Sequence, residues 1–145
     1  MKKGFTLVEL LLVVTILGIL AAIAVPKLFP QSERARVAEA VSVLQSIRQG
    51  EAAYRLEKDI YLDCPGADVN CWNNLGMDNP NPTAKYFTYS VTSVAGASPT
   101  FTATAIRKSG LEDPGNKFGS KRITLNQNGT YCVGSGSTFH PFCPA

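Results

Sequence analysis

Histidine is almost absent from the 145-residue sequence, in which His140 is the single one, and only 17% of the residues are charged. One histidine leaves no visible nucleophile–base constellation and no histidine-rich metal site. The formal charge of +3 is too small to indicate a nucleic-acid partner. Four oxygen-bearing residues of the central region also lack the spacing of a calcium-binding loop: Asp68, Asn70, Asp78 and Asn79. We therefore expect no enzymatic activity, no metal ion and no cofactor.

Charge is also scarce near the amino terminus, where Glu9 is the single charged residue between positions 5 and 26. As a helix, these 22 residues would extend ~33 Å, which is enough to cross the hydrocarbon core of a bilayer. Lys2 and Lys3 precede the stretch and Lys27 follows it. The positive amino-terminal end is expected to stay in the cytoplasm, which places the rest of the chain outside.

A cleaved secretory signal is the plain alternative, because the small residues 21–24 resemble a signal-peptidase site. The mature chain would then be a secreted disulfide domain that begins near Val25. Glu9 opposes this interpretation, since a plain signal gains nothing from a carboxylate inside its apolar run. The segment also continues through Pro26 into a helical stretch, as a retained segment would.

Two prolines, Pro26 and Pro30, follow the apolar run. Each removes a backbone hydrogen bond and strains the preceding turn. We therefore expect a kink or a break between Ala24 and Gln31, after which Ser32 caps a new helix.

A helical pattern follows, with apolar side chains at Val37, Val41, Leu44 and Ile47. Tyr54 extends this stripe after a gap at Glu51, and the helix is expected to end near Lys58. Such a stripe predicts that the helix packs on a sheet.

Alternating patterns then predict strands at 86–92, 100–106, 122–125 and 130–133, with turns at 96–99 and 126–129. Residues 62–85 are expected to form an irregular connection. The fold class is therefore α+β: one long amino-terminal helix, apolar in its first half, on an antiparallel sheet of about four strands.

All four cysteines lie beyond the apolar segment: Cys64, Cys71, Cys132 and Cys143. An even number in the part that would be exported favours disulfides, and the spacings are too wide for Cys-x-x-Cys zinc pairs. Three pairings are possible. We favour Cys64–Cys71 and Cys132–Cys143, because each closes a short loop rich in turn-forming residues.

Residues 4–9 (GFTLVE), followed by an apolar helix and Pro26, resemble the amino-terminal signature of type IV prepilins and of the related pseudopilins of type II secretion. The resemblance covers about the first thirty residues, and the rest agrees in layout with the type IV pilin fold. The carboxy-terminal cysteine loop resembles the disulfide loop common in pilins.

This resemblance implies that a membrane prepilin peptidase cuts between Gly4 and Phe5 and methylates the new amine of Phe5. The chain would then consist of a leader (1–4), a transmembrane and filament-core helix (5–30) and a globular head (31–145).

The resemblance also assigns assembly roles. Thr6 and Glu9 match the positions after the cut, whereas Gly18 and Pro26 match positions between which the helix can lose its regular hydrogen bonds in the filament. A carboxylate deep in hydrocarbon is unfavourable without a partner. The amine of Phe5 on a neighbouring copy is the expected partner of Glu9, and compensation of its own helix amino terminus is the alternative.

The expected product is a homo-oligomeric filament: a prepilin in the bacterial inner membrane that the pilus machinery assembles into an extracellular pilus for adhesion or twitching motility. A secretion pseudopilin is the first alternative. The second is a DNA-uptake pilin, whose basic residues would be Lys108, Lys117, Lys121 and Arg122; a solvated surface explains these residues better.

Overall fold

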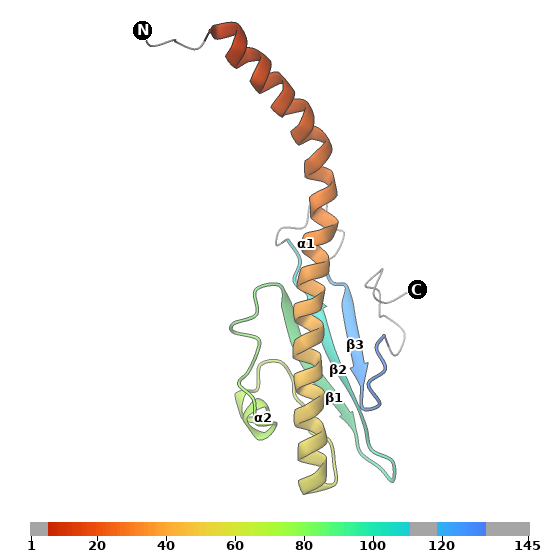
Figure 1. The fold of residues 1–145 in the computed structure, drawn as a ribbon. Helices are drawn as coiled ribbons and strands as arrows, with labels where there is room; N and C mark the ends of the chain where they lie inside the picture. Colours follow the sequence, from red (N-terminus) through yellow and green to blue (C-terminus); the bar gives the residue numbers. More distant parts are fainter. Residues whose placement is uncertain (1–5, 111–118, 133–145) are drawn as a thin grey trace. The chain divides into compact units, whose positions relative to one another are not determined.

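The computed structural model describes residues 6–110 and 119–132, without the side chains of 25–31. It contains two helices and three strands in the order α1 (Leu7–Lys58), α2 (Val69–Asn74), β1 (Phe87–Val94), β2 (Thr100–Arg107) and β3 (Arg122–Asn126) (Figure 1). The chain divides into two compact units, Met1–Val37 and Ala38–Ala145, and α1 contributes to both.

In the first unit, α1 continues through residues 25–31 without interruption. The predicted break between Ala24 and Gln31 is therefore wrong, and Ser32 lies inside the helix and does not start a new one. Helix formation is cooperative, so the many helical turns on either side can keep the backbone helical at the two prolines, although each proline costs about 3 kcal/mol.

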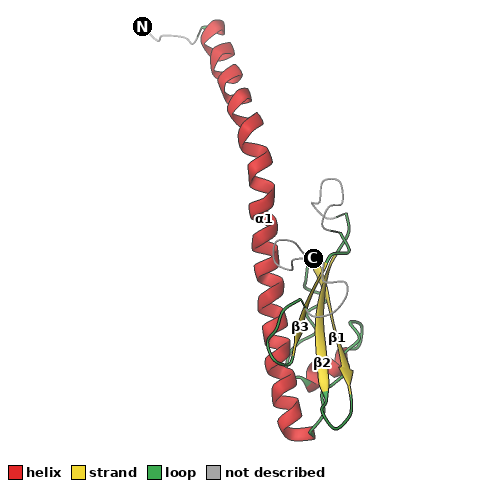
Figure 2. Cartoon of the chain, turned by 90° about the vertical axis from the view of Figure 1, so that its right-hand side faces the viewer, coloured by secondary structure: helices red, strands yellow, loops and turns green. Residues whose placement is uncertain are grey.

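The second unit is built on an antiparallel sheet with the strand order β1-β2-β3. Val91 faces Ala103 across the first pair of strands, and Ala103 faces Leu125 across the second. Figure 2 shows the part of α1 that belongs to this unit lying along one face of the sheet. The predicted α+β class is confirmed.

The core of this unit lies between α1 and the sheet. Leu44 and Ile47 of the predicted stripe are fully buried, and Val41 is half-buried. The stripe has no gap at Glu51, which is also fully buried. The helix ends at Lys58 as predicted, because Asp59 adopts a positive φ of 61° and turns the chain.

The sheet has three strands where about four were expected. The segment after the 126–129 turn forms an isolated bridge between Leu125 and Tyr131. Cys132 still donates from its backbone N–H to Thr124 O at 2.8 Å. Its φ of 65° then bends the chain out of the extended conformation, which ends the ladder. Val133, the last residue of the predicted strand, lies outside the described residues.

The connection between α1 and β1 is less irregular than predicted, because it contains the short helix α2. Asp68 caps α2, and its side chain accepts a hydrogen bond from the Asn70 N–H at 2.9 Å. The Cys64–Cys71 disulfide forms as predicted. Cys132 is disulfide-bonded too, and its predicted partner Cys143 lies outside the described residues.

Candidate functional site

The candidate site is the amino-terminal half of α1. Gly4 and Phe5, between which cleavage is expected, lie outside the described residues, so Thr6 is the first predicted site residue with a described position. Glu9 and Gly18 follow on the same helix, and residue 26 is helical in its backbone. The predicted roles of all these residues stay predictions.

Thr6 and Glu9 form a reciprocal cap at the start of α1. The Glu9 N–H donates to Thr6 Oγ1 at 3.3 Å. In return, Glu9 Oε2 accepts from Thr6 Oγ1 at 3.3 Å and from the Thr6 N–H at 3.5 Å. This arrangement is a capping box, in which residues three apart satisfy backbone N–H groups at the helix start.

The capping box gives Glu9 a role within its own chain. A carboxylate near the first turn also interacts favourably with the helix dipole. The local signal was present in the sequence, because Thr6-Leu7-Val8-Glu9 has the Thr-x-x-Glu spacing of a capping box. Both hydrogen bonds from Thr6 go to Oε2 of the carboxylate, so the cap does not require the second oxygen, Oε1.

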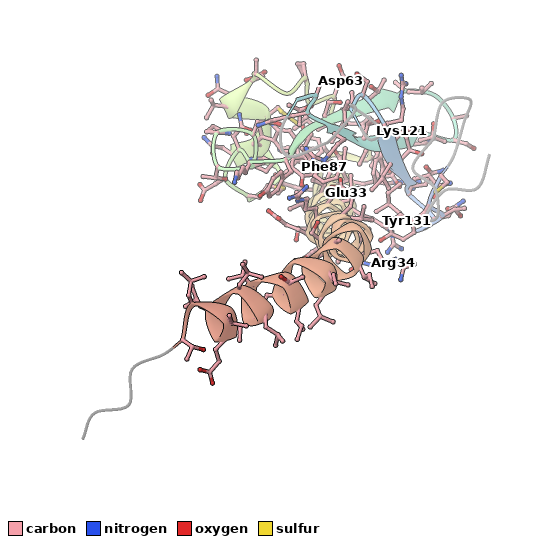
Figure 3. All side chains as sticks on the ribbon, turned by 90° about the horizontal axis from the view of Figure 1, so that it is seen from above. Glu33, Arg34, Asp63, Phe87, Lys121 and Tyr131 are labelled. Carbon is pink, nitrogen blue, oxygen red and sulfur yellow. A yellow bond between two sulfur atoms is a disulfide. The ribbon has the colours of Figure 1, made fainter. Side chains whose placement is uncertain are left out.

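Apolar side chains cover the helix on all sides between Leu7 and Ala24. This 18-residue stretch is long and apolar enough to cross a membrane, and none of it is buried. Its large apolar side chains are between 45% exposed, at Val13, and 79% exposed, at Leu7. Figure 3 shows these side chains projecting outward around the helix. A helix that is apolar all round needs lipid or other protein around it.

Two residues adapt this stretch to apolar surroundings. Thr15 turns its hydroxyl back onto the helix and donates to Leu11 O at 2.7 Å, so its polar group is satisfied without water. A Cβ built at Gly18 would meet no atom within 4 Å. Gly18 therefore relieves no crowding inside the chain, and its small size is available to a neighbouring molecule.

The head contains a fully buried acid, Glu51, that the sequence did not predict. Glu51 Oε2 accepts a hydrogen bond from the Leu62 N–H at 2.9 Å, whereas Oε1 has no partner within the described part of the chain. Burial raises the pKa of Glu51 to about 7; the bond from Leu62 opposes this shift and nearby Asp63 adds to it. Burial likewise raises the pKa of Tyr89, with a smaller contribution from Glu39.

The basic residues considered for nucleic-acid binding gather at one end of the sheet. Ile106 of β2 pairs with Arg122 of β3, which brings Lys108 and Lys121 to the same end (Figure 3 labels Lys121). Lys108 Nζ donates to Ala84 O at 2.6 Å. Lys117 lies outside the described residues. Among the residues that the structure describes, no cluster of three metal-binding side chains occurs.

Comparison with known families finds a match, which lies at the amino terminus. Residues 1–25 match the family described as "Prokaryotic N-terminal methylation motif". This segment contains Gly4, Phe5, Thr6, Glu9 and Gly18.

Curated relatives extend the similarity. The chain is 43% identical over 62 residues to the type IV major pilin protein PilA of Myxococcus xanthus, covering 43% of this chain and 28% of the relative. It is 45% identical over 56 residues to a fimbrial protein of Pseudomonas aeruginosa, covering 39% and 36%. It is 38% identical over 60 residues to the type II secretion system core protein G of Pectobacterium carotovorum, covering 41% and 38%. The chain thus spans about a third of the length of these relatives, and no solved structure matches it significantly.

An apolar helix that begins within a methylation motif and is followed by an α+β head has the layout expected of a pilin-type subunit. By similarity, the chain is thus related to type IV pilins and to a type II secretion core protein.

Proposed function

We propose that this protein is a subunit of a type IV pilus that assembles through the apolar half of α1. The observation that carries the proposal is the unburied apolar stretch Leu7–Ala24, which begins inside a methylation motif. A helix of this kind is stable in lipid and, outside lipid, must be covered by other protein.

Processing precedes assembly. A prepilin peptidase removes residues 1–4 by cutting between Gly4 and Phe5, and the amine of Phe5 is methylated. Residues 5–30 then form the membrane and filament-core helix, and residues 31–145 form the head. The cut brings a cationic amine within a few residues of Glu9, whose carboxylate already points toward Thr6.

Burial of apolar surface drives assembly. In the inner membrane the helix lies among lipid chains, and in the filament copies of the same helix replace them. Each square ångström of apolar surface removed from water contributes about 25 cal/mol. Head-to-tail contacts that do not close into a ring generate a helical fibre. The fibre would be displayed on the cell surface, where adhesion and twitching motility are its proposed uses.

A pseudopilin is the second candidate, and the similarity to core protein G of a type II secretion system favours it. The two functions differ in where the filament lies, because a pseudopilus is a short periplasmic fibre. Abundance of the subunit in fibres sheared from the cell surface supports the pilus; its confinement to the envelope supports the pseudopilus.

A DNA-uptake pilin is a weaker candidate that rests on Lys108, Lys121 and Arg122 at one end of the sheet. Binding to DNA that weakens steeply with salt, and that Lys121→Ala with Arg122→Ala removes, would support it.

Mass spectrometry of the mature subunit, combined with electron microscopy of cell-surface material, tests the main proposal. The expected chain begins with N-methylated Phe5 and is found in fibres. A mature chain that begins near Val25 would contradict it.

The charge of Glu9 can be separated from its capping role. Glu9→Gln keeps an amide oxygen for the capping box and removes the charge, whereas Thr6→Ala removes the cap and keeps the charge. If the carboxylate pairs with the amine of a neighbouring copy, Glu9→Gln lowers filament yield and leaves membrane insertion unchanged. Glu39→Gln, at an exposed position on the same helix, is the matched control. Normal filament yield from Glu9→Gln would show that charge does not set the register.

A further inference from the structure

Strand β1 lies at the edge of the sheet, because the strand order is β1-β2-β3. In an antiparallel pair, alternate residues direct their backbone N–H and C=O groups toward the partner strand and away from it. Tyr89, Val91 and Ser93 of β1 direct these groups outward, as their hydrogen bonds to the preceding segment show. An open edge of this kind is where sheets pair with other chains.

The sequence of β1 lacks the residues that usually disfavour such pairing. Phe87–Val94 (FTYSVTSV) contains no charged residue, no proline and no glycine, and it alternates aromatic or β-branched residues with threonine and serine. Edge strands that avoid pairing usually carry a lysine, a proline or a bulge. Segments with high strand propensity and without charge or proline are prone to self-association when exposed.

The segment that precedes β1 covers this edge. Cys64 and Val91 form an isolated antiparallel bridge. The Cys64 N–H donates to Val91 O at 3.0 Å, and the Val91 N–H donates to Cys64 O at 2.8 Å. Both outward groups of Val91 are therefore satisfied inside the chain.

Side chains occupy the neighbouring positions of the edge. Asn81 imitates a peptide group: its Oδ1 accepts from the Tyr89 N–H at 2.6 Å, and its Nδ2 donates to Tyr89 O at 3.0 Å. At the other end, Asp63 Oδ1 accepts from the Ser93 N–H at 3.2 Å (Figure 3 labels Asp63). Three successive outward-facing residues are thus capped by Asn81, Cys64 and Asp63.

A covalent bond holds the cover in place. Cys64, which makes the central bridge, is joined by a disulfide to Cys71 of α2, and both are buried. Asn81 Nδ2 also donates to Gly66 O at 2.9 Å, which ties the two parts of the cover together. A Cβ at Gly66 would lie 2.8 Å from Tyr89 O, so glycine permits this close approach to β1.

We propose that residues 63–81 form an edge lock fastened by oxidation: the Cys64–Cys71 disulfide keeps the edge of β1 closed, and its reduction opens this edge to antiparallel pairing with β1 of a second copy of the chain. Reduction by a dithiol gives two thiols on the protein and a disulfide on the reductant. A second copy is the matching occupant because its edge has the same uncharged alternation of donors and acceptors. The proposal is independent of helix-driven assembly, since it concerns the edge of the sheet and not the apolar half of α1.

The test uses the full-length chain in detergent micelles, in which Cys64→Ser and Cys71→Ser are combined. Hydrogen exchange reports the amides of Tyr89, Val91 and Ser93, and light scattering reports the mass of the protein. We expect exchange at these three amides to accelerate by roughly tenfold or more at dilution. We also expect the mass to rise from monomer to dimer or larger as concentration increases.

Adding Val91→Pro to the double variant identifies the surface that associates. Proline has no N–H to donate across the edge, so association through β1 should disappear. Association through the apolar helix would persist. Oligomers that are found in the double variant but not in the parent chain and that survive Val91→Pro would overturn the proposal. So would a folded double variant that stays monomeric with unchanged exchange at the three amides. Far-ultraviolet circular dichroism and Trp72 fluorescence establish that each variant is folded.

Asn81→Ala tests the lock with the disulfide intact. Exchange at Tyr89 should accelerate, while exchange at Val91 stays slow. Thr83→Ala is the matched control, because its hydroxyl bonds to Pro80 O within the same segment and not to β1. Unchanged exchange at Tyr89 in Asn81→Ala would contradict the lock even if the cysteine variant failed to fold.

Discussion

The two ends of α1 have opposite surroundings. Between Leu7 and Ala24 the side chains are exposed on every side of the helix. Between Ala40 and Ile47 the apolar side chains form one stripe, of which Ala40, Leu44 and Ile47 are fully buried within the head. One secondary structure element therefore contains a segment that requires external partners and a segment that already has its partner.

This contrast shows how the pattern of apolar residues around a helix determines which surroundings can cover it. A stripe at intervals of three and four residues fits the face of one sheet. Apolar residues all round the helix cannot be covered by a single sheet, so the sequence directs that segment to lipid or to further helices. Matched substitutions in the two segments can test this difference.

Truncating one side chain in each segment should change the stability of the head by very different amounts. Leu44→Ala removes a fully buried side chain and should lower the free energy of unfolding of the head by about 2–5 kcal/mol. Leu12→Ala, at a 57% exposed position, should change that free energy by less than about 0.5 kcal/mol. Thermal unfolding of the detergent-solubilised chain measures both. Equal destabilisation by the two variants would show that the segments are not independent.

A charge in each segment gives a second contrast. Leu12→Lys places an ammonium group in the middle of the apolar stretch, which should disfavour membrane insertion by about 3 kcal/mol. Gln49→Lys, at an exposed position of the head, should leave insertion unchanged. The fraction of protein that resists carbonate extraction from membranes measures the effect. Full membrane retention of Leu12→Lys would argue against a spanning helix.

Local patterns predicted much of this molecule. The ends of β1 and β2 are within two residues of the predicted strands, and the 126–129 turn forms, with the Gly129 N–H donating to Asn126 O at 3.0 Å. The helix end at Lys58 is also confirmed. These features depend on alternation, turn residues and apolar spacing, which are visible in short stretches of sequence.

Features that depend on distant contacts or on long-range cooperativity were not predicted. The helix α1 is continuous because many intact helical turns outweigh the cost of two prolines, which short stretches of sequence do not show. The short helix α2 depends on the burial of Trp72 as well as on its Asp68 cap. The sequence predicts a polar interruption of the stripe at Glu51, because it does not show that the Leu62 N–H forms a hydrogen bond with this side chain. The capping box of Thr6 and Glu9 was visible locally and was missed.

The buried acid of the head should make stability depend on pH. The folded state raises the pKa of Glu51 from 4.5 to about 7, so it binds a proton that the unfolded chain releases between these values. The head should therefore be most stable below about pH 4.5 with respect to this group, lose stability as pH rises, and level off above about pH 7. Each unit of this shift corresponds to about 1.4 kcal/mol.

Glu51→Gln should remove this pH dependence while keeping an oxygen for the Leu62 N–H. Denaturant unfolding at pH 5 and pH 8 measures the effect, and Glu39→Gln is the control at an exposed position of the same helix. A slope that persists in Glu51→Gln would assign the pH dependence to another group.

The smallest predicted effect is at the start of α1. Thr6→Ala removes the cap and should weaken the first turn by about 1 kcal/mol, which faster hydrogen exchange at residues 7–9 would report. Thr15→Ala also loses a helix-directed hydroxyl but lies beyond the first turn, so these amides should not change. Equal exchange in the two variants would show that the capping box does not stabilise the helix start.

The central claim is that the apolar segment of α1 is retained and exchanges lipid for copies of itself. An electron cryomicroscopy reconstruction of the native filament tests it most directly. We expect a core in which the Leu7–Ala24 helices of successive subunits pack against one another, surrounded by the heads. A fibre held together by the heads alone, with this helix missing or outside the core, would contradict it.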